Sequence, residues 1–203
     1  MEELLEESEK VTPAKAVKIL RDKNGLKDKS IGFGNEKALN QLLAHHGIVF
    51  KPEQKLVWIS ANPYQLGEFV CYDLNKVFGY KIENNSESRV LKTMAETKLN
   101  IAKDSFLDTK EYADYEQFRI KNREFDKALN DKIELSEEFI SNFKSLNPEL
   151  WVVYYKIGKY YQEKKQFQRA SDNFETALTK EITTLPDRKE VEKQLKKVKR
   201  KLG

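Results

Sequence analysis

Two adjacent histidines and a single cysteine are the side chains of this sequence best suited to catalysis or metal binding. His45 and His46 open an apolar stretch that predicts a β-strand, in which neighbouring residues point to opposite faces. The two imidazoles therefore cannot hold one metal ion without a bulge, and the spacing offers no second partner for acid–base chemistry. Cys71 lies inside another predicted strand, where no basic residue is placed to lower its pKa. We predict no catalytic residue, no metal and no cofactor; the alternative is a general base at one histidine.

Gly32-Phe33-Gly34 is the only other motif with a chemical reading, because glycine-rich loops can bind phosphate groups. A dinucleotide fingerprint needs a third glycine and a preceding strand, and a P-loop ends in Gly-Lys-Ser/Thr. Both features are missing from residues 25–35. We therefore expect an ordinary turn there.

Charge is concentrated at the C-terminal end of the sequence. The 203 residues include 37 basic and 33 acidic side chains, a net charge of +4, and residues 187–203 alone carry eight basic and three acidic groups. A nucleic-acid-binding surface spread over the protein is therefore not indicated, and we predict no nucleic-acid partner. No apolar run approaches the roughly 20 residues that span a bilayer, so we also predict no membrane span. The acidic start, MEELLEESEK, does not resemble a signal peptide, and the sequence leaves the compartment unknown.

The first eighty residues predict helices followed by a small antiparallel sheet. Thr12-Pro13 has the pattern of a helix start, with the helix ending at Asn24-Gly25 in a left-handed cap. Residues 44–50 and 55–60 form two arms of a hairpin joined at Lys51-Pro52-Glu53-Gln54, and residues 68–74 supply a third strand. Because both faces of the hairpin are apolar, we expect the sheet to be covered on both sides.

This part of the chain also resembles a known enzyme family. The segments TPAKAVKILRDKNGL, GFGNEKALNQLLAHH and HHGIVFKPEQKLVWISANPYQLGEFVCYDLNKVF are similar to the C-terminal part of the acyl-CoA:6-aminopenicillanic acid acyltransferases. These belong with the choloylglycine hydrolases among the N-terminal-nucleophile hydrolases. The resemblance implies a partial αββα sandwich, whose catalytic groups, including the nucleophilic cysteine, would all map upstream of Met1. It further implies an exported parent family and a missing N-terminal catalytic half as partner, in the same longer chain or in a separate one.

The second half of the sequence predicts only helices. Residues 87–99 can form a helix, and aromatic residues at helical spacing predict a long helix over 109–131. Another helix starts at Ser136 and stops before Asn147-Pro148. Residues 151–184 then match the spacing of a tetratricopeptide repeat, whose packing residues would be Tyr154, Ile157, Gly158, Tyr161, Ala170, Phe174 and Ala177.

The repeat must be covered by neighbouring helices, since one repeat cannot bury its own faces. The last helix, residues 187–202, has Val191, Leu195, Val198 and Leu202 on one stripe and basic residues around the rest of its circumference. We interpret it as a solvated capping helix; contact with nucleic acid, acidic lipid or an acidic partner is the alternative.

The sequence therefore predicts an α+β protein in three parts. Residues 1–82 are the acyltransferase-like sheet portion, residues 83–108 a connector, and residues 109–203 a helical region with one repeat at about 148–184 and a capping helix at 187–202. Two functions follow. The first is a C-terminal part of an acyltransferase or amide hydrolase, inactive by itself because it lacks the nucleophile. The second is a noncatalytic module that binds a protein or peptide on its tetratricopeptide-like helices.

Overall fold

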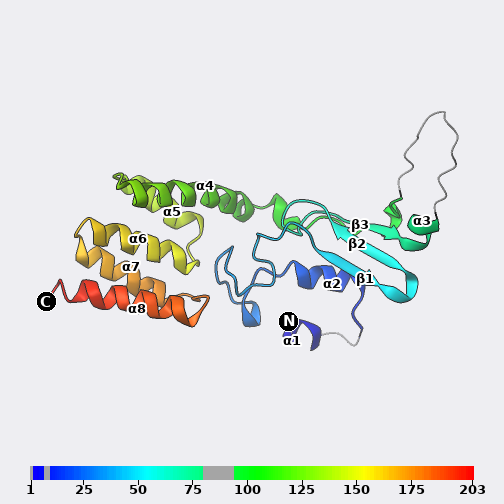
Figure 1. The fold of residues 1–203 in the computed structure, drawn as a ribbon, viewed down its shortest axis with the longest axis horizontal. Coiled ribbons are helices and arrows are strands. Elements are labelled where there is room, and N and C mark those ends of the chain that lie inside the picture. Colours follow the sequence, from blue (N-terminus) through cyan, green and yellow to red (C-terminus); the bar gives the residue numbers. More distant parts are fainter. Residues whose placement is uncertain (1, 7–9, 80–93) are drawn as a thin grey trace. The chain divides into compact units, whose positions relative to one another are not determined.

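The computed structural model describes residues 2–6, 10–79 and 94–203. Within these residues the fold is mixed α+β, with eight α-helices and one three-stranded antiparallel sheet (Figure 1). The sheet and the C-terminal helices belong to different compact units.

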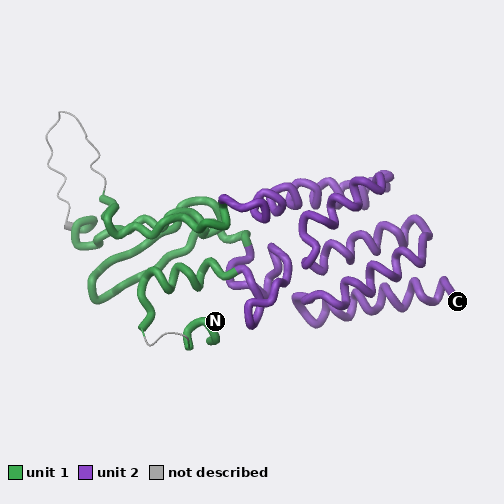
Figure 2. Tube along the Cα trace, turned by 180° about the vertical axis from the view of Figure 1, so that it is seen from behind, with its two compact units in different colours: residues 1–22, 42–107 green, residues 23–41, 108–203 purple. Residues whose placement is uncertain are grey.

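The two units do not follow the chain in a simple order. The first consists of Met1–Asp22 and Leu42–Leu107, and the second of Lys23–Gln41 and Asp108–Gly203 (Figure 2). The segment Lys23–Gln41, which the sequence analysis assigned to the sheet portion, thus belongs with the C-terminal helices.

The first unit opens with the short helix α1 (Glu2–Glu6) and with α2 (Pro13–Leu20). The Thr12 hydroxyl accepts a hydrogen bond from the Lys15 amide at 3.2 Å, which confirms the predicted N-cap. The predicted end of the helix is wrong. α2 stops at Leu20, and Gly25 has a φ of −84°, outside the left-handed region.

Arg21 directly follows the last residue of α2 and anchors this end of the helix. Its guanidinium turns into the unit and donates to the carbonyl oxygens of Gln65, Gly67 and Ala102 at 3.2, 2.7 and 2.8 Å. The side chain is 9% exposed, and burial lowers the pKa of the guanidinium. Only a planar group with several diverging N–H donors can satisfy carbonyls on separate loops at once. Arg21 therefore ties α2 to two segments distant in sequence.

The predicted hairpin and third strand are confirmed. Strands β1 (Ile48–Lys51), β2 (Leu56–Ser60) and β3 (Phe69–Asp73) pair in the order β1-β2-β3, all antiparallel. The turn between β1 and β2 is the 3₁₀ segment Pro52–Gln54. The first strand is shorter than expected, however, since it begins at Ile48.

The two faces of the sheet differ. Val49, Trp58 and Cys71 lie in register across the three strands and pack in one core with Val17 and Phe69. The opposite face carries Ile48, Phe50 and Ile59, which are 50%, 63% and 37% exposed. The prediction that the sheet is covered on both faces is therefore wrong for these three side chains.

The last helix of the first unit is α3 (Leu74–Gly79). The helix predicted over 87–99 falls partly outside the described residues. Its described end is not α-helical: Ala95 forms a β-bridge with Tyr72, and Thr97–Leu99 is a 3₁₀ turn. The backbone pairing to β3 replaces the helical hydrogen bonds there.

The second unit is built from five longer helices. They are α4 (Lys110–Asp131), α5 (Glu137–Leu146), α6 (Trp151–Glu163), α7 (Phe167–Thr179) and α8 (Leu185–Lys199). The hydroxyls of Thr109, Ser136 and Thr184 accept the amide hydrogen bonds that cap α4, α5 and α8. The predicted start at Ser136 and the helix over 109–131 are thus confirmed, because local capping chemistry determined both boundaries.

Helices α6 and α7 approach closely because a small residue lies where they meet. A Cβ atom on Gly158 would lie 2.7 Å from the ring of Phe174, and Phe174 and Ala170 are fully buried. α8 continues this layer: the Gln162 side chain donates to Gln194 at 3.1 Å. Each helix of the hairpin is therefore covered by a neighbour.

The buried stripe of α8 differs from the predicted one. Val191 and Val198 are fully buried, but Leu202 lies beyond the helix and is 46% exposed. Gln194 is buried between Val191 and Val198, and its carboxamide accepts a hydrogen bond from Gln162. Leu195 lies at the edge of the stripe and is only partly buried.

The glycine loop packs against the junction of α5 and α6 as a turn. Gly32 and Gly34 both have φ near +83°, and a Cβ on Gly32 would lie 2.4 Å from the backbone of Leu150. The Asn147 side chain accepts from the Phe33 amide at 3.1 Å and donates to the Phe33 carbonyl at 2.8 Å. The motif therefore permits a close backbone approach.

Candidate functional site

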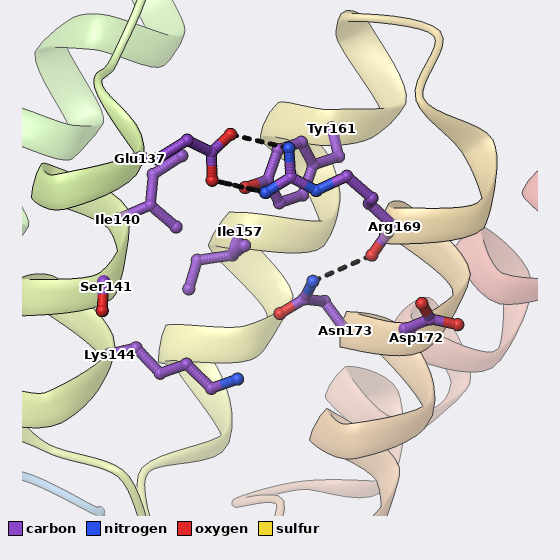
Figure 3. Close-up of a pocket in the computed structure, with 9 residues that line it drawn as sticks. All are labelled: Glu137, Ile140, Ser141, Lys144, Ile157, Tyr161, Arg169, Asp172 and Asn173. Carbon is purple, nitrogen blue, oxygen red and sulfur yellow. Dashed lines mark hydrogen bonds and ion pairs between the residues drawn. The ribbon is translucent and has the colours of Figure 1, made fainter.

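A groove on the second unit is lined by three consecutive helices, α5, α6 and α7. It encloses about 360 Å³. Figure 3 shows its lining side chains, which are Glu137, Ile140, Ser141, Lys144, Ile157, Tyr161, Arg169, Asp172 and Asn173. The volume is at the lower end of the range for ligand sites and suits one or two side chains of a peptide better than a large cofactor.

The floor of the groove is apolar. Ile140, Ile157 and Tyr161 are 6%, 1% and 2% exposed. Ile157 and Tyr161 are four residues apart on α6, so they lie on one face of that helix, and Ile140 meets them from α5. The core packing of the helices therefore also produces the floor.

A charged cluster closes one end of the groove. Arg169 of α7 pairs with Glu137 of α5 through both guanidinium branches, one of them at 2.6 Å, and its guanidinium carbon lies 3.9 Å from the Tyr161 ring centre (Figure 3). The hydrogen bond from Arg169 holds the pKa of Glu137 below its ordinary value. Burial, with Glu137 adding to it, raises the pKa of Tyr161 to about 12.

The raised pKa keeps the Tyr161 phenol neutral, and the lowered pKa keeps Glu137 ionised and paired with Arg169. None of the three groups is thereby activated as a nucleophile or a base. The Arg169 and Glu137 side chains are 44% and 69% exposed, so solvent screens the pair and it contributes less than about 1 kcal/mol to stability. The cluster instead connects α5 to α7 and shapes the end of the groove.

The opposite end presents the Lys144 ammonium and the Asn173 amide. The Lys144 ammonium lies 5.2 Å from the Tyr154 ring centre and, among the described residues, makes no ion pair. The Asn173 amide donates to the Arg169 carbonyl at 2.8 Å, which leaves its own carbonyl oxygen as an acceptor. This end can therefore bind an anionic or hydrogen-bonding group beside the apolar floor.

Most of the residues predicted from the sequence lie behind this groove rather than in its lining. All seven repeat-packing residues are buried on α6 and α7: Tyr154, Ile157, Gly158, Tyr161, Ala170, Phe174 and Ala177. Only Ile157 and Tyr161 of these line the groove. Lys144 and Arg169 were missed. The helical spacing of Glu137, Ser141 and Lys144 places them on one polar face of α5, which could have identified that face as a candidate site. The sequence does not indicate, however, which helix packs beside this face.

The histidines and the cysteine do not form a site. His45 and His46 are exposed and precede β1, and the His46 Nδ1 lies 3.4 Å from the Ser60 carbonyl oxygen. Cys71 is fully buried, and burial, followed by the nearby carboxylates of Glu96 and Asp73, raises the pKa of its thiol. A raised pKa opposes thiolate chemistry. Across the described ranges, no three potential His, Cys, Asp or Glu ligands come close enough to hold a metal ion.

Comparisons of the chain with protein-family models, with curated proteins and with solved structures found no match. The resemblance to penicillin acyltransferases therefore stays a prediction. Of the helices that the structure describes, none combines the length and the apolar character needed to cross a membrane. What the geometry defines is an α+β protein with an apolar-floored groove on its helical unit.

Proposed function

We propose that the helical unit is a noncatalytic protein-interaction module of tetratricopeptide-like construction, and that the groove between α5 and α7 binds a short peptide segment. The observation that carries the proposal is the groove itself: an apolar floor at Ile140 and Ile157 beside Lys144, a cation that makes no ion pair among the described residues. Peptide sites combine an apolar pocket for side chains with a few polar groups that fix orientation.

The packing of the helices supports the tetratricopeptide-like part of the proposal. The small residues Gly158 and Ala170 let α6 and α7 approach closely, as this class of repeat requires. Lys156 of α6 bonds to Asn122 of α4 at 2.7 Å, and α6 bonds to α8 through Gln162. Alternate helices are therefore neighbours, which is the arrangement expected of stacked helical hairpins.

The experiment is a selection of short peptides from a random library on the purified chain, followed by affinity measurements on groove variants. Lys144→Glu reverses the charge at the rim, and Lys127→Glu makes the same change on an exposed residue of α4. We expect selected peptides to lose about tenfold in affinity with Lys144→Glu and nothing with Lys127→Glu. When a selected peptide is added, the changes in the NMR chemical shifts of the backbone amides should concentrate on α5 to α7. Equal binding to both variants, or shifts elsewhere, would refute the proposal.

A second candidate function is the acyltransferase-like one, and one observation favours it. The exposed Ile48, Phe50 and Ile59 form an apolar sheet face of the kind that a further layer covers in a sandwich. In this candidate the first unit contributes strands to a sandwich completed by the missing catalytic half, and the purified 203 residues hydrolyse neither thioesters nor amides. Detectable thioester or amide turnover by the purified 203 residues would contradict this candidate.

A further inference from the structure

Helix α8 carries a row of basic side chains on the surface that faces away from its neighbours. The row, here called the basic ridge, consists of Lys189, Lys193, Lys196, Lys197 and Arg200, all exposed. The buried residues Val191, Gln194 and Val198 lie on the opposite side of the helix. From Lys189 to Arg200 the ridge is about 16 Å long, with at least one cation per helical turn.

Most of this charge is not neutralised. Within the described residues only Lys193 of the ridge forms an ion pair, with Glu190 at 3.2 Å, while Lys199 beside the ridge pairs with Glu175. Four like charges on one short helix face repel one another, which opposes stability unless an anion lies against them. This repulsion destabilises the helix only slightly in water, but an anionic partner relieves it, so the repulsion favours binding of such a partner.

An apolar hollow lies along one flank of the ridge. It is shallow and open to solvent, has a volume of about 480 Å³, and is lined by Glu192, Leu195, Lys196, Lys199 and Arg200. Leu195 is the apolar residue of this group and is only partly buried. The hollow can therefore take an apolar side chain at the same time as the ridge meets anionic groups.

We propose that this face of α8 binds an acidic amphipathic helix of a partner protein, with carboxylates on the basic ridge and a leucine-type side chain against Leu195. One acidic side chain per helical turn matches the spacing of the ridge, as in the flanking ion pairs of paired helices. This surface is separate from the groove of α5 to α7, and the inference does not depend on the function proposed for that groove.

The flanks of the ridge favour a narrow partner over a broad anionic surface. Glu190 borders it on one side, and Glu192 is exposed on the other. A duplex backbone or a lipid surface is wide enough to bring anions against these carboxylates as well. The apolar stripe of α8 is already used in its own unit, so it cannot enter a bilayer. A single acidic helix can lie on the ridge and the hollow without covering Glu190, so that of these two carboxylates it meets only Glu192, which lines the hollow.

The test is fluorescence anisotropy with a labelled helical peptide that has one glutamate per turn on one face and a central leucine beside them. Lys196→Glu/Lys197→Glu should weaken binding at least about tenfold. The matched control is Arg123→Glu/Lys127→Glu, which reverses two exposed charges on α4 and brings the net charge from +4 to 0 in the same way. The control should bind like the unaltered protein.

Further measurements on the unaltered protein distinguish an acidic helix from a lipid surface or a nucleic acid as the partner, and they do not depend on the folding of any variant. On the unaltered protein, replacing the peptide's leucine by serine should weaken binding several-fold, and distributing its glutamates around the helix should abolish most of it. Vesicles with phosphatidylserine and random duplex DNA should bind more weakly than the peptide. Equal loss in both charge-reversal variants, indifference to the leucine, or tighter binding of vesicles or duplex would overturn the proposal.

Discussion

The contact of Gly158 with Phe174 makes a sharp test of how the helical unit is held together. In a Gly158→Val variant the new Cβ would lie 2.7 Å from two ring carbons of Phe174, well inside ordinary van der Waals contact. Phe174 cannot move aside easily, because it is fully buried and its ring centre lies 6.0 Å from that of Tyr155. The helices must therefore separate or the ring must leave its rotamer.

The expected loss is about 2 kcal/mol in the free energy of unfolding of the helical unit. Overpacking a core costs roughly 1–3 kcal/mol. Valine is a slightly better helix former than glycine, and this returns only about 0.3 kcal/mol. Because these contributions arise from one contact, the cost should shrink when Phe174 is shortened.

Urea unfolding followed by far-ultraviolet circular dichroism measures the effect. Three proteins accompany Gly158→Val: Phe174→Leu, the double variant, and Ala113→Val, which introduces valine at an exposed position of α4. The exposed control should lose no more than about 0.7 kcal/mol. If Gly158→Val is as stable as the exposed control, or if the two core substitutions add without coupling, the close approach of α6 and α7 does not depend on Gly158.

Three more predictions concern individual side chains. Arg21→Met should cost the first unit about 3 kcal/mol, because it leaves several buried carbonyls unsatisfied, and Arg21→Lys should not restore it; hydrogen exchange of the β2 and β3 amides measures this. Glu181 accepts hydrogen bonds from Lys37 and Lys29 that lower its pKa, so its contribution is present above the ordinary value of 4.5 and is lost as the pH falls through the lowered one. Glu181→Gln should therefore lower stability by less than about 1 kcal/mol at neutral pH and leave it unchanged in acid, as thermal unfolding at both pH values can check. Finally, the buried Cys71 thiol should react with an aromatic disulfide only after denaturation, and rapid reaction of the native protein would contradict its burial and raised pKa.

Local chemistry made several elements readable from the sequence. Thr12 and Ser136 mark helix starts because a hydroxyl caps amides only three residues away. The hairpin and its turn follow from β-branched residues around Pro52. The spacing of small and aromatic residues in α6 and α7 was visible for the same reason, since helix periodicity puts them on one face.

Other features depended on partners distant in the chain. Arg21, directly after α2, donates to carbonyls more than 40 residues away, which no local pattern in the sequence indicates; the helix boundary predicted from the local signal at Gly25 was wrong. Gln194 is buried on α8 with its carboxamide hydrogen-bonded to Gln162 of α6, whereas Leu202 lies beyond the end of the helix and is exposed. The groove has the same origin: the sequence determines the apolar faces of α5 and α6, but only the packing of α5 beside α7 brings Lys144 and the Glu137–Arg169 pair to its two ends. Capping and helix periodicity depend on residues only a few positions apart, so they can be predicted from the sequence. A site formed by three helices depends on how those helices pack, and only the tertiary structure shows this.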